Sequence, residues 1–346
     1  MVGWENLWAA WKRAAQDKRS RSTTCRFEFH LADELLQLQR ELVEGRYRPG
    51  PYVHFTLNEG KRRLISAAPF RDRVVHHALC AVIEPRFESI FIPDSYANRV
   101  GKGTHKAIDR FQQLARRYRY VLRMDVVKHF PSIDHQILFE ILDGRLRDPR
   151  IAELIRRILA SGADLPEAQA DACLFPGDDL LDLCRPKGLP IGNLTSQFWS
   201  NCYLHPFDQF VKRELGCQGY LRYVDDFALF SDSKAELWAW RHAVIERLAR
   251  LRLRVHENAA QVAPVVSGIP WLGFVVYPTH RLLKARKAVH ATRHLTARYG
   301  ELLEGRIRLA TFRASVQAWI NHARHGDTWG LRAKVLYNFV LPLGQG

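Results

Sequence analysis

The chain has 346 residues, of which 47% are hydrophobic, so it can bury a sizeable core and is not wholly disordered. Its 52 lysine and arginine residues outnumber its 36 acidic residues, and the resulting formal charge of +16 indicates a polyanionic partner rather than a merely soluble basic protein. The six cysteines form no C-x-x-C pair, which argues against a zinc ribbon, and a chain of this size needs no disulfides to fold.

The sequence shows no sign of export or of a membrane anchor. Its first 21 residues lack the apolar run and the small-residue cleavage site of a signal peptide. A stretch of about 18 uninterrupted apolar residues, the length that a transmembrane helix requires, is also missing. We therefore expect a cytoplasmic protein with no membrane contact.

The first third of the chain is predicted to be mostly helical. Trp4, Trp8 and Trp11 recur at helical spacing, which indicates a packed face of an opening helix. Residues 17–26 are basic and poor in apolar side chains, so we expect a loop or a flexible arm there. The remaining predicted elements are helices at Leu31–Leu42, Phe70–Ile83 and Thr104–Tyr118, and a hairpin of strands Tyr52–Leu57 and Arg63–Ser66 with Lys61, Arg62 and Arg63 at or near its tip.

The middle of the chain alternates between strand and helix signals. A short apolar strand, Tyr120–Met124, runs into an acid, and residues 219–230 carry the next strong strand signal. Residues 161–187 contain several Gly, Pro and Asp residues and little periodicity, which is typical of a surface insertion. The other predicted elements are helices at Ile133–Leu142, Arg150–Leu159, Leu194–Glu214 and Lys234–Leu251, and strands near Leu253–His256 and Trp271–Val276.

The C-terminal segment from Arg281 to Gly346 is predicted to be a basic helical tail. It contains 12 basic and 3 acidic residues, a net charge of +9 that is more than half of the total. Such a segment would suit the phosphate backbone of a nucleic acid.

Adjacent acids lie at the centre of the strand signal in 219–230. Asp225 and Asp226 separate two runs of aromatic and branched residues, which predicts a hairpin with both carboxylates at its turn. For two acids alone, a solvated turn is the alternative. Asp125, at the end of another apolar strand, changes the interpretation, because neighbouring strands would set it against Asp225. Three carboxylates would then hold two Mg²⁺ ions, or Mn²⁺ in their place, roughly 3.5–4 Å apart.

With these residues in view, the sequence resembles the reverse transcriptase family over nearly its whole length. The segment Tyr223–Asp226 resembles the catalytic hairpin of that family, and Asp125 with Phe130 resembles its first metal motif. The other matching blocks, in the order and approximate spacing of the family, are Arg63–Ser66, Phe70–Leu79, Ser95–His105 and Gly268–Phe274.

The resemblance implies an α+β fold of the right-hand polymerase type, with fingers, a palm built on an antiparallel sheet, and an α-helical thumb. The expected domains are an N-terminal helical extension (1–50), fingers (51–119), a palm (120–280) that contains the insertion 161–187, and a basic helical thumb (281–346). The implied activity is that of an RNA-directed DNA polymerase.

The same resemblance implies roles for residues around the three acids. It makes Asp125, Asp225, Asp226 and the backbone carbonyl of Val126 the metal ligands. It places Phe130 under the incoming sugar, where a ring would clash with a 2′ hydroxyl; core packing is the alternative. The basic residues Lys61 and Arg63 fall where the family grips the incoming triphosphate, and a solvated basic hairpin is the alternative.

The segment after Gly188 departs from the usual pattern of the family. Most members have Gln at the position of Ile191 and Pro at the position of Gln197, whereas Ile-Gly-x-x-x-Ser-Gln is similar to reverse transcriptases of diversity-generating retroelements. Gly192 would permit close approach to the nascent base pair. Because Ile191 offers no hydrogen-bonding group, we hypothesise that it lowers fidelity. The resemblance implies misincorporation opposite template adenines.

Contacts to template and primer are also implied. The candidates near the catalytic hairpin are Ser196, Gln197 and Tyr223, and those in the thumb are Arg281, Lys284, Arg286 and Lys287. For the thumb residues, a solvated helix face is the alternative. His256 could donate a proton to pyrophosphate, but a structural histidine on a strand is the alternative, and we leave that role unassigned.

Diversity-generating members work with a template RNA, cDNA or primer, deoxynucleotides and an oligomer of a small basic accessory protein. The resemblance implies these partners here, with residues 161–187 and the N-terminal arm as candidate docking surfaces. Two other functions stay open: a reverse transcriptase of a phage-defence system or of a reduced group II intron, and a non-catalytic RNA-binding scaffold. The three intact acids argue against the scaffold.

Overall fold

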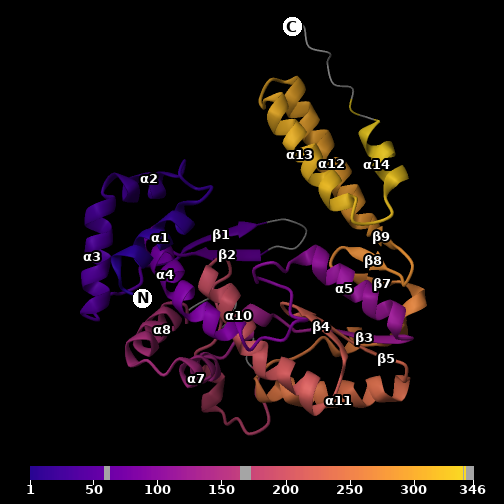
Figure 1. The fold of residues 1–346 in the computed structure, drawn as a ribbon, viewed down its shortest axis with the longest axis horizontal. Coiled ribbons are helices and arrows are strands. Elements are labelled where there is room, and N and C mark those ends of the chain that lie inside the picture. The colour runs from indigo at the N-terminus through magenta and orange to yellow at the C-terminus, as the bar shows by residue number, and fades with distance from the viewer. Residues whose placement is uncertain (58–62, 164–172, 338, 340–346) are drawn as a thin grey trace.

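The computed structural model describes residues 1–57, 63–163, 173–337 and 339, and it shows a central antiparallel sheet covered by helices (Figure 1). Helices α1–α3 lie at one side of this centre, and α12–α14 stand apart from it at the C-terminal end of the chain (Figure 1). The mixed composition of helix and strand agrees with the α+β class expected from the sequence.

The central sheet has the strand order β4-β5-β3-β6, and every pair in it is antiparallel. Its strands are β3 (Tyr120–Asp125), β4 (Gly219–Tyr223), β5 (Asp226–Ser231) and β6 (Val262–Pro264). Successive side chains of a strand point to opposite faces. Along β5, Phe227 and Leu229 accordingly join one core, and Ala228 and Phe230 join another.

Helices cover both faces of this sheet. The core around Phe227 is completed by α10 (Leu194–Gln209) and α11 (Lys234–Arg250), and the core around Phe230 by α5 (Thr104–Arg117). The predicted helix Leu194–Glu214 is confirmed as α10 followed by the π-helix Phe210–Glu214. Because both faces are buried, the strands are apolar almost throughout, which explains the strong strand signal in the sequence.

The N-terminal helices α1 (Trp4–Ala15), α2 (Ser22–Phe29) and α3 (Leu31–Val43) share a core with α4 (Phe70–Glu88), α7 (His135–Leu146) and α8 (Pro149–Ser161). The loop predicted at 17–26 is wrong from Ser22 onward. Phe27 of α2 is buried and packs edge-on against Phe70 of α4, with ring centroids 5.1 Å apart. Burial against α4 therefore stabilises a helix that local composition does not favour.

A two-stranded hairpin, β1 (Val53–Leu57) and β2 (Arg63–Ala67), extends from the helical side toward the sheet. It is joined to the start of α10 by hydrogen bonds. The backbone N–H of Ser66 donates to the carbonyl of Ile191 (3.0 Å), and the Asn193 amide donates to the carbonyl of Ser66 (2.7 Å). The Asn193 side-chain oxygen also accepts from the N–H of Ala68 (3.0 Å). The predicted turn at Gly60 and Lys61 lies outside the described residues.

A second small sheet precedes the C-terminal helices. It contains β7 (Ile269–Trp271), β8 (Phe274–Val276) and β9 (Arg281–Leu283), in that order. The single strand predicted at Trp271–Val276 is wrong, because Leu272 and Gly273 adopt φ of 41° and 94° and form a two-residue hairpin turn. Residues 281–283 form a strand where the sequence suggested helix.

The C-terminal helices are α12 (Ala285–Leu303), α13 (Leu309–Ala323) and α14 (Trp329–Leu336), and they share a small separate core. The short remaining helices are α6 (His129–Ser132), η1 (Leu181–Cys184), η3 (Glu257–Ala259) and η4 (Val265–Ser267). The strand predicted near Leu253–His256 is present only as an isolated bridge between Val126 and Val255.

Candidate active site

The register of the central sheet brings the three predicted acids together. Asp125, the last residue of β3, lies directly opposite Asp226, the first residue of β5. Residues that are directly opposite in an antiparallel pair project from the same face. Asp225 belongs to the two-residue turn between β4 and β5, and its carbonyl accepts a hydrogen bond from the N–H of Val126 (3.4 Å). We refer to Asp125, Asp225 and Asp226 as the carboxylate cluster.

The turn between β4 and β5 is strained, and a buried ion pair supports it. Val224 has φ of 56°, which is unfavourable for a β-branched residue and costs about 1–3 kcal/mol. Its carbonyl accepts a hydrogen bond of 2.9 Å from Nη1 of Arg222. Arg222 is fully buried and forms an ion pair with Asp208, which is also fully buried. Sequence reasoning missed this pair, which holds the turn that carries Asp225.

Electrostatics in the carboxylate cluster favour a bound cation. The pKa of Asp225 is raised to about 6, mainly by burial and also by the negative charges of Asp125 and Asp226, while Arg63 opposes the shift. Repulsion between closely spaced carboxylates is relieved by a divalent cation, which prefers oxygen ligands. The residues present therefore fit such an ion.

This cluster is not a closed metal centre. Within the described ranges, no three His, Cys, Asp or Glu side chains converge in a way that would hold an ion by themselves. Mg²⁺ typically takes one or two protein carboxylates and completes its octahedral shell with water and substrate phosphates. An open arrangement of acids is thus compatible with an ion that is shared with a nucleotide.

The backbone next to Asp125 leaves room for the predicted carbonyl ligand. Val126 pairs with Val255, but the hydrogen bonds of this bridge are from the N–H of Val127 to Arg254 (2.8 Å) and from the N–H of His256 to Asp125 (3.0 Å). The carbonyl of Val126 takes no part in these two bonds. His256 is exposed, and the proton donor to pyrophosphate stays unassigned.

Comparison with known proteins identifies the family. The profile of the family described as reverse transcriptase (RNA-dependent DNA polymerase) matches residues 55–276, well over half of the chain. The chain belongs to the reverse transcriptase family. This result confirms the right-hand polymerase fold and the activity of an RNA-directed DNA polymerase expected from the sequence. Enzymes of this family use divalent metal ions such as Mg²⁺, and they bind template RNA and nucleotides.

The individual relatives include a protein encoded by a group II intron. This reverse transcriptase is 28% identical over 314 aligned positions to "Protein YkfC" of Escherichia coli, which takes in 79% of this chain and 74% of that protein. It is 24% identical over 182 positions to "Group II intron-encoded protein LtrA" of Lactococcus lactis, covering 52% of this chain and only 28% of LtrA. A telomerase structure from Candida tropicalis aligns with a TM-score of 0.48 at 11% identity, over 74% of this chain and 60% of that one.

Of the helices within the described ranges, none combines the length and the apolar character needed to cross a membrane.

The residues predicted to contact the nucleotide come from different elements of the fold. Arg63 is exposed at the start of β2, near enough for its charge to act on Asp225. Lys61 lies outside the described residues. Phe130 is half-buried in α6, where it packs against the main core, and its carbonyl accepts from the N–H of Leu189 (2.9 Å). Because the ring is only half-buried, its packing in the core is compatible with a role at the incoming sugar.

Gly192 is required for a reason that the sequence did not reveal. Its φ is 109°, and an added Cβ would lie 2.8 Å from Cγ2 of Ile65 on β2. This close approach is made to the β1–β2 hairpin, and the approach to the nascent base pair stays a prediction. Ile191, half-buried beside it, bonds through its backbone to Ser66.

The predicted template and primer contacts divide into accessible and inaccessible residues. Gln197 is exposed, but Ser196 is 1% exposed, so its side chain presents no surface to a template. The hydroxyl of Tyr223 lies 2.8 Å from that of Thr104, which fixes the catalytic hairpin to the start of α5.

In the thumb segment, Arg281 forms an ion pair with Asp109 (2.7 Å). Arg286 and Lys287 are exposed on α12. Burial lowers the pKa of Lys284, the positive charge of Arg123 lowers it too, and Asp226 opposes the shift. Lys284 therefore lies within electrostatic reach of the carboxylate cluster, closer to the chemistry than its place in the basic tail suggested.

Arg123 is a second residue that sequence reasoning missed. Its Nε lies 3.9 Å from Oδ1 of Asp226, and its Nη1 donates to the carbonyl of Pro270 (2.6 Å) on β7. It therefore links the carboxylate cluster to the second sheet. The signal was available, because Arg123 is two residues before Asp125 on the same strand and so faces the same side.

Proposed function

We propose that this reverse transcriptase extends a primer on template RNA with deoxynucleotides at Asp125, Asp225 and Asp226, and that it serves a diversity-generating retroelement. The first part of the proposal depends on one observation, the register that sets Asp125 opposite Asp226 next to the turn that carries Asp225. The second part depends on the segment from Ile191 to Gln197.

In the proposed reaction, the primer 3′ oxygen bonds to the α-phosphorus, and the bond to pyrophosphate breaks. Two bound divalent cations would lower the pKa of the primer hydroxyl and neutralise charge on the triphosphate. Asp125, Asp225 and Asp226 would hold them, together with the carbonyl of Val126. Arg63 would pair with triphosphate oxygens through its planar fork, with Lys61 beside it.

Sugar selection is assigned to Phe130. Its half-buried ring is anchored in the core and is thus stiff enough to exclude a 2′ hydroxyl by contact. Base selection is assigned to the segment at Ile191 and Gly192. An aliphatic side chain there provides no polar check on a misaligned pair, which supports error-prone copying. Why adenine would be singled out does not follow from these residues.

Primer extension on an RNA template tests the polymerase. We expect Asp226→Asn to reduce the rate by about 10²–10³-fold or more, because lost stabilisation of transition-state charge is worth several kcal/mol. Asp232→Asn is the matched control, since Asp232 follows the other end of β5 and its side chain is 55% exposed. Equal rates for the two variants would argue against the carboxylate cluster and favour a non-catalytic scaffold.

Error spectra test the retroelement assignment. We expect Ile191→Gln to lower misincorporation opposite template adenine, and Ile191→Val, which keeps an aliphatic side chain, to leave it high. An unchanged adenine spectrum in Ile191→Gln would remove the support that Ile191 gives. A near-identical pair of genomic repeats differing chiefly at adenines would support the same assignment, together with an accessory protein.

The similarity to LtrA favours a second candidate, a reverse transcriptase of the group II intron type. Accurate copying at adenines, without such a repeat pair, would support this candidate over the retroelement. Because the match covers only 28% of LtrA, we extend to this chain only the polymerisation activity and not the other functions of LtrA.

A further inference from the structure

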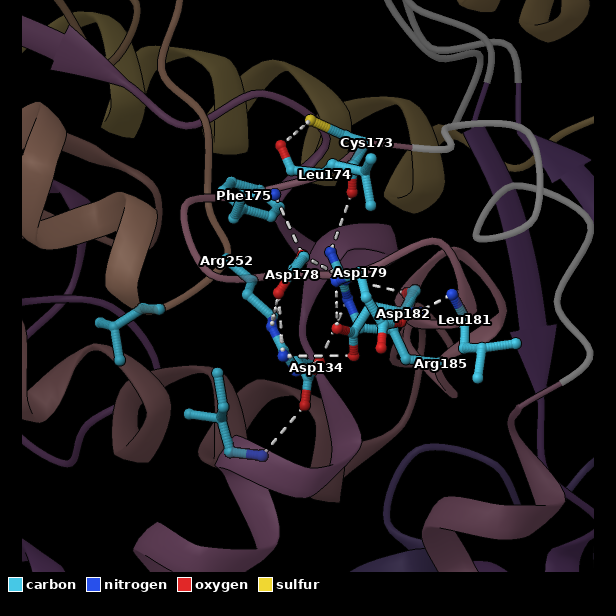
Figure 2. Close-up of polar contacts among 12 residues, drawn as sticks. Asp134, Cys173, Leu174, Phe175, Asp178, Asp179, Leu181, Asp182, Arg185 and Arg252 are labelled. Carbon is cyan, nitrogen blue, oxygen red and sulfur yellow. Dashed lines mark hydrogen bonds and ion pairs between the residues drawn. The ribbon is translucent and has the colours of Figure 1, made fainter.

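A buried ionic network lies next to the segment that carries Phe130. It contains two carboxylates and two guanidinium groups, and each arginine contacts both acids: Asp134, Asp178, Arg185 and Arg252 (Figure 2). We call these four residues the ionic network. They come from three parts of the chain, because Asp134 precedes α7, Asp178 and Arg185 belong to the insertion, and Arg252 follows α11.

The ionic network is largely shielded from water, although the side chain of Arg252 is 25% exposed. Arg185 lies 2.6 Å from Asp178 and 3.4 Å from Asp134. Arg252 lies 2.8 Å from Asp134 and 3.0 Å from Asp178. The carboxylates of Asp134 and Asp178 are only 1% and 4% exposed. Each charge is neutralised from two directions, as a buried ion pair requires if it is not to be costly.

Such a network is a poor source of stability, because desolvation offsets most of the attraction. Its contribution is geometric, since four charges in mutual contact admit few arrangements. The insertion is therefore not simply a loose surface loop. Residues 173–187 of the insertion are held against Asp134 and Arg252 through Arg185 and Asp178, whereas residues 164–172 lie outside the described residues.

Beside the ionic network, residues 130–135 and residues 186–189 form a strand-like pairing. The N–H of His135 donates to Pro186 (3.1 Å), and the N–H of Gly188 donates to Ile133 (2.8 Å). One step further along, the N–H of Leu189 donates to the carbonyl of Phe130 (2.9 Å). Residues 130–135 thus run beside residues 186–189, and Asp134 and Arg185 close the far end of this pairing.

The segment after α11, residues 252–256, supports the end of β3, where Asp125 lies. Arg252 adopts φ of 53° and begins residues 252–256, which hydrogen-bond to Val127 and Asp125. The hydroxyl of Tyr203 joins the same region, because it donates to the carbonyl of Leu251 (2.6 Å) and accepts from the N–H of Asp134 (3.3 Å). The ionic network therefore joins three segments: residues 252–256, which bond to Asp125, residues 130–135, which include Phe130, and residues 186–189, which precede Ile191.

We infer that the ionic network positions Phe130 and residues 188–192 against Asp125 and thereby sets the selection of the incoming nucleotide. The inference rests on the proposed function, because it takes Phe130 and Ile191 to face that nucleotide. All four side chains act through other residues and do not touch the reacting atoms. A small displacement of a reacting group costs up to about a hundredfold in rate, so a loosened support is measurable.

Asp178→Asn is the most direct test, because it removes one charge and keeps the shape of the side chain. Asp179→Asn is the matched control, since Asp179 is its neighbour but is exposed and bonds only within the local turn. With primer and RNA template at saturation, we expect Asp178→Asn to raise KM for deoxynucleotides about tenfold and to lower kcat far less. We also expect weaker discrimination against ribonucleotides. Asp178→Glu, which keeps the carboxylate, is expected to restore much of both.

A purely structural role predicts a different result. If Asp178→Asn lowered the melting temperature but matched Asp179→Asn in nucleotide KM and sugar discrimination, the inference would be overturned. Should Asp178→Asn fail to fold, Arg252→Lys keeps the charge but loses the fork that contacts both acids, and the same comparison applies to it. If the wild-type protein did not extend a primer, the proposed function itself would be refuted. The two failures are therefore distinguishable.

Discussion

The ion pair between Arg222 and Asp208 offers the sharpest test of how the catalytic hairpin is held. Both side chains are 0% exposed. Asp208 accepts hydrogen bonds from Nε of Arg222 (2.8 Å), from Nη2 of Arg222 (2.7 Å) and from the hydroxyl of Tyr220 (2.7 Å). Asp208→Asn keeps the shape but leaves the guanidinium group buried without its counter-charge.

We expect Asp208→Asn to lower the free energy of unfolding by about 3–5 kcal/mol, the cost of breaking a buried ion pair from one side. Urea-induced unfolding, followed by circular dichroism, measures this change. Glu153→Gln is the control, because it breaks an ion pair with Arg157 in which Glu153 is 49% exposed, and it is expected to cost less than about 1 kcal/mol.

The double variant Asp208→Leu/Arg222→Met separates stability from activity. Replacing both charges by apolar groups is expected to recover most of the lost stability. Activity is expected to stay low, because the carbonyl of Val224 loses its bond to Arg222 and the turn that carries Asp225 is no longer braced. A cost for Asp208→Asn no larger than that of Glu153→Gln would refute this reasoning.

Other predictions concern the residues around the carboxylate cluster. Gly192→Ala is expected to cost about 1–3 kcal/mol, because of its positive φ and the contact with Ile65, and Ile65→Ala should relieve part of this loss in thermal unfolding. Because the pKa of Asp225 is raised from its ordinary value of 3.8 to about 6, its contribution to stability is lost as the pH rises through 6. Asp225→Asn is thus expected to raise the melting temperature of the metal-free protein at pH 7.5 but not at pH 4, and an equal gain at both values would contradict this sign. Lys284→Ala is expected to weaken primer–template binding and to reduce its salt slope by about one, and an unchanged slope would exclude a phosphate contact.

The carboxylate cluster was predictable because its signals are local. Strand alternation identified β3 and the β4–β5 hairpin, and an acid at the end of each apolar run indicated where the strands meet. The partner of Asp125 was expected to be Asp225, whereas the register pairs it with Asp226. A one-residue difference at a turn is beyond what spacing alone resolves.

What could not be predicted depends on tertiary contacts. Helix α2 is stabilised by the packing of Phe27 against Phe70, and the composition of residues 17–26 does not predict that contact. The turn between β7 and β8 uses Leu272 and Gly273 rather than the Asn-Gly or Asp-Gly pairs that mark a two-residue hairpin. The partner of Arg222 is Asp208, on a different element, and no periodicity links them.

The hydrogen bonds of Ser66 and Asn193, with the contact of Gly192 against Ile65, have a consequence for building chimaeras. Residues 63–67 and 190–193 are distant in sequence but form a single exchangeable module. A hairpin transplanted from a relative would bring that relative's side chain at position 65. That side chain would be matched to the relative's own residue at position 192 and not to Gly192. The two segments are therefore best exchanged together. Natural recombination that separated them would produce hybrid enzymes in which the two segments pack poorly against each other.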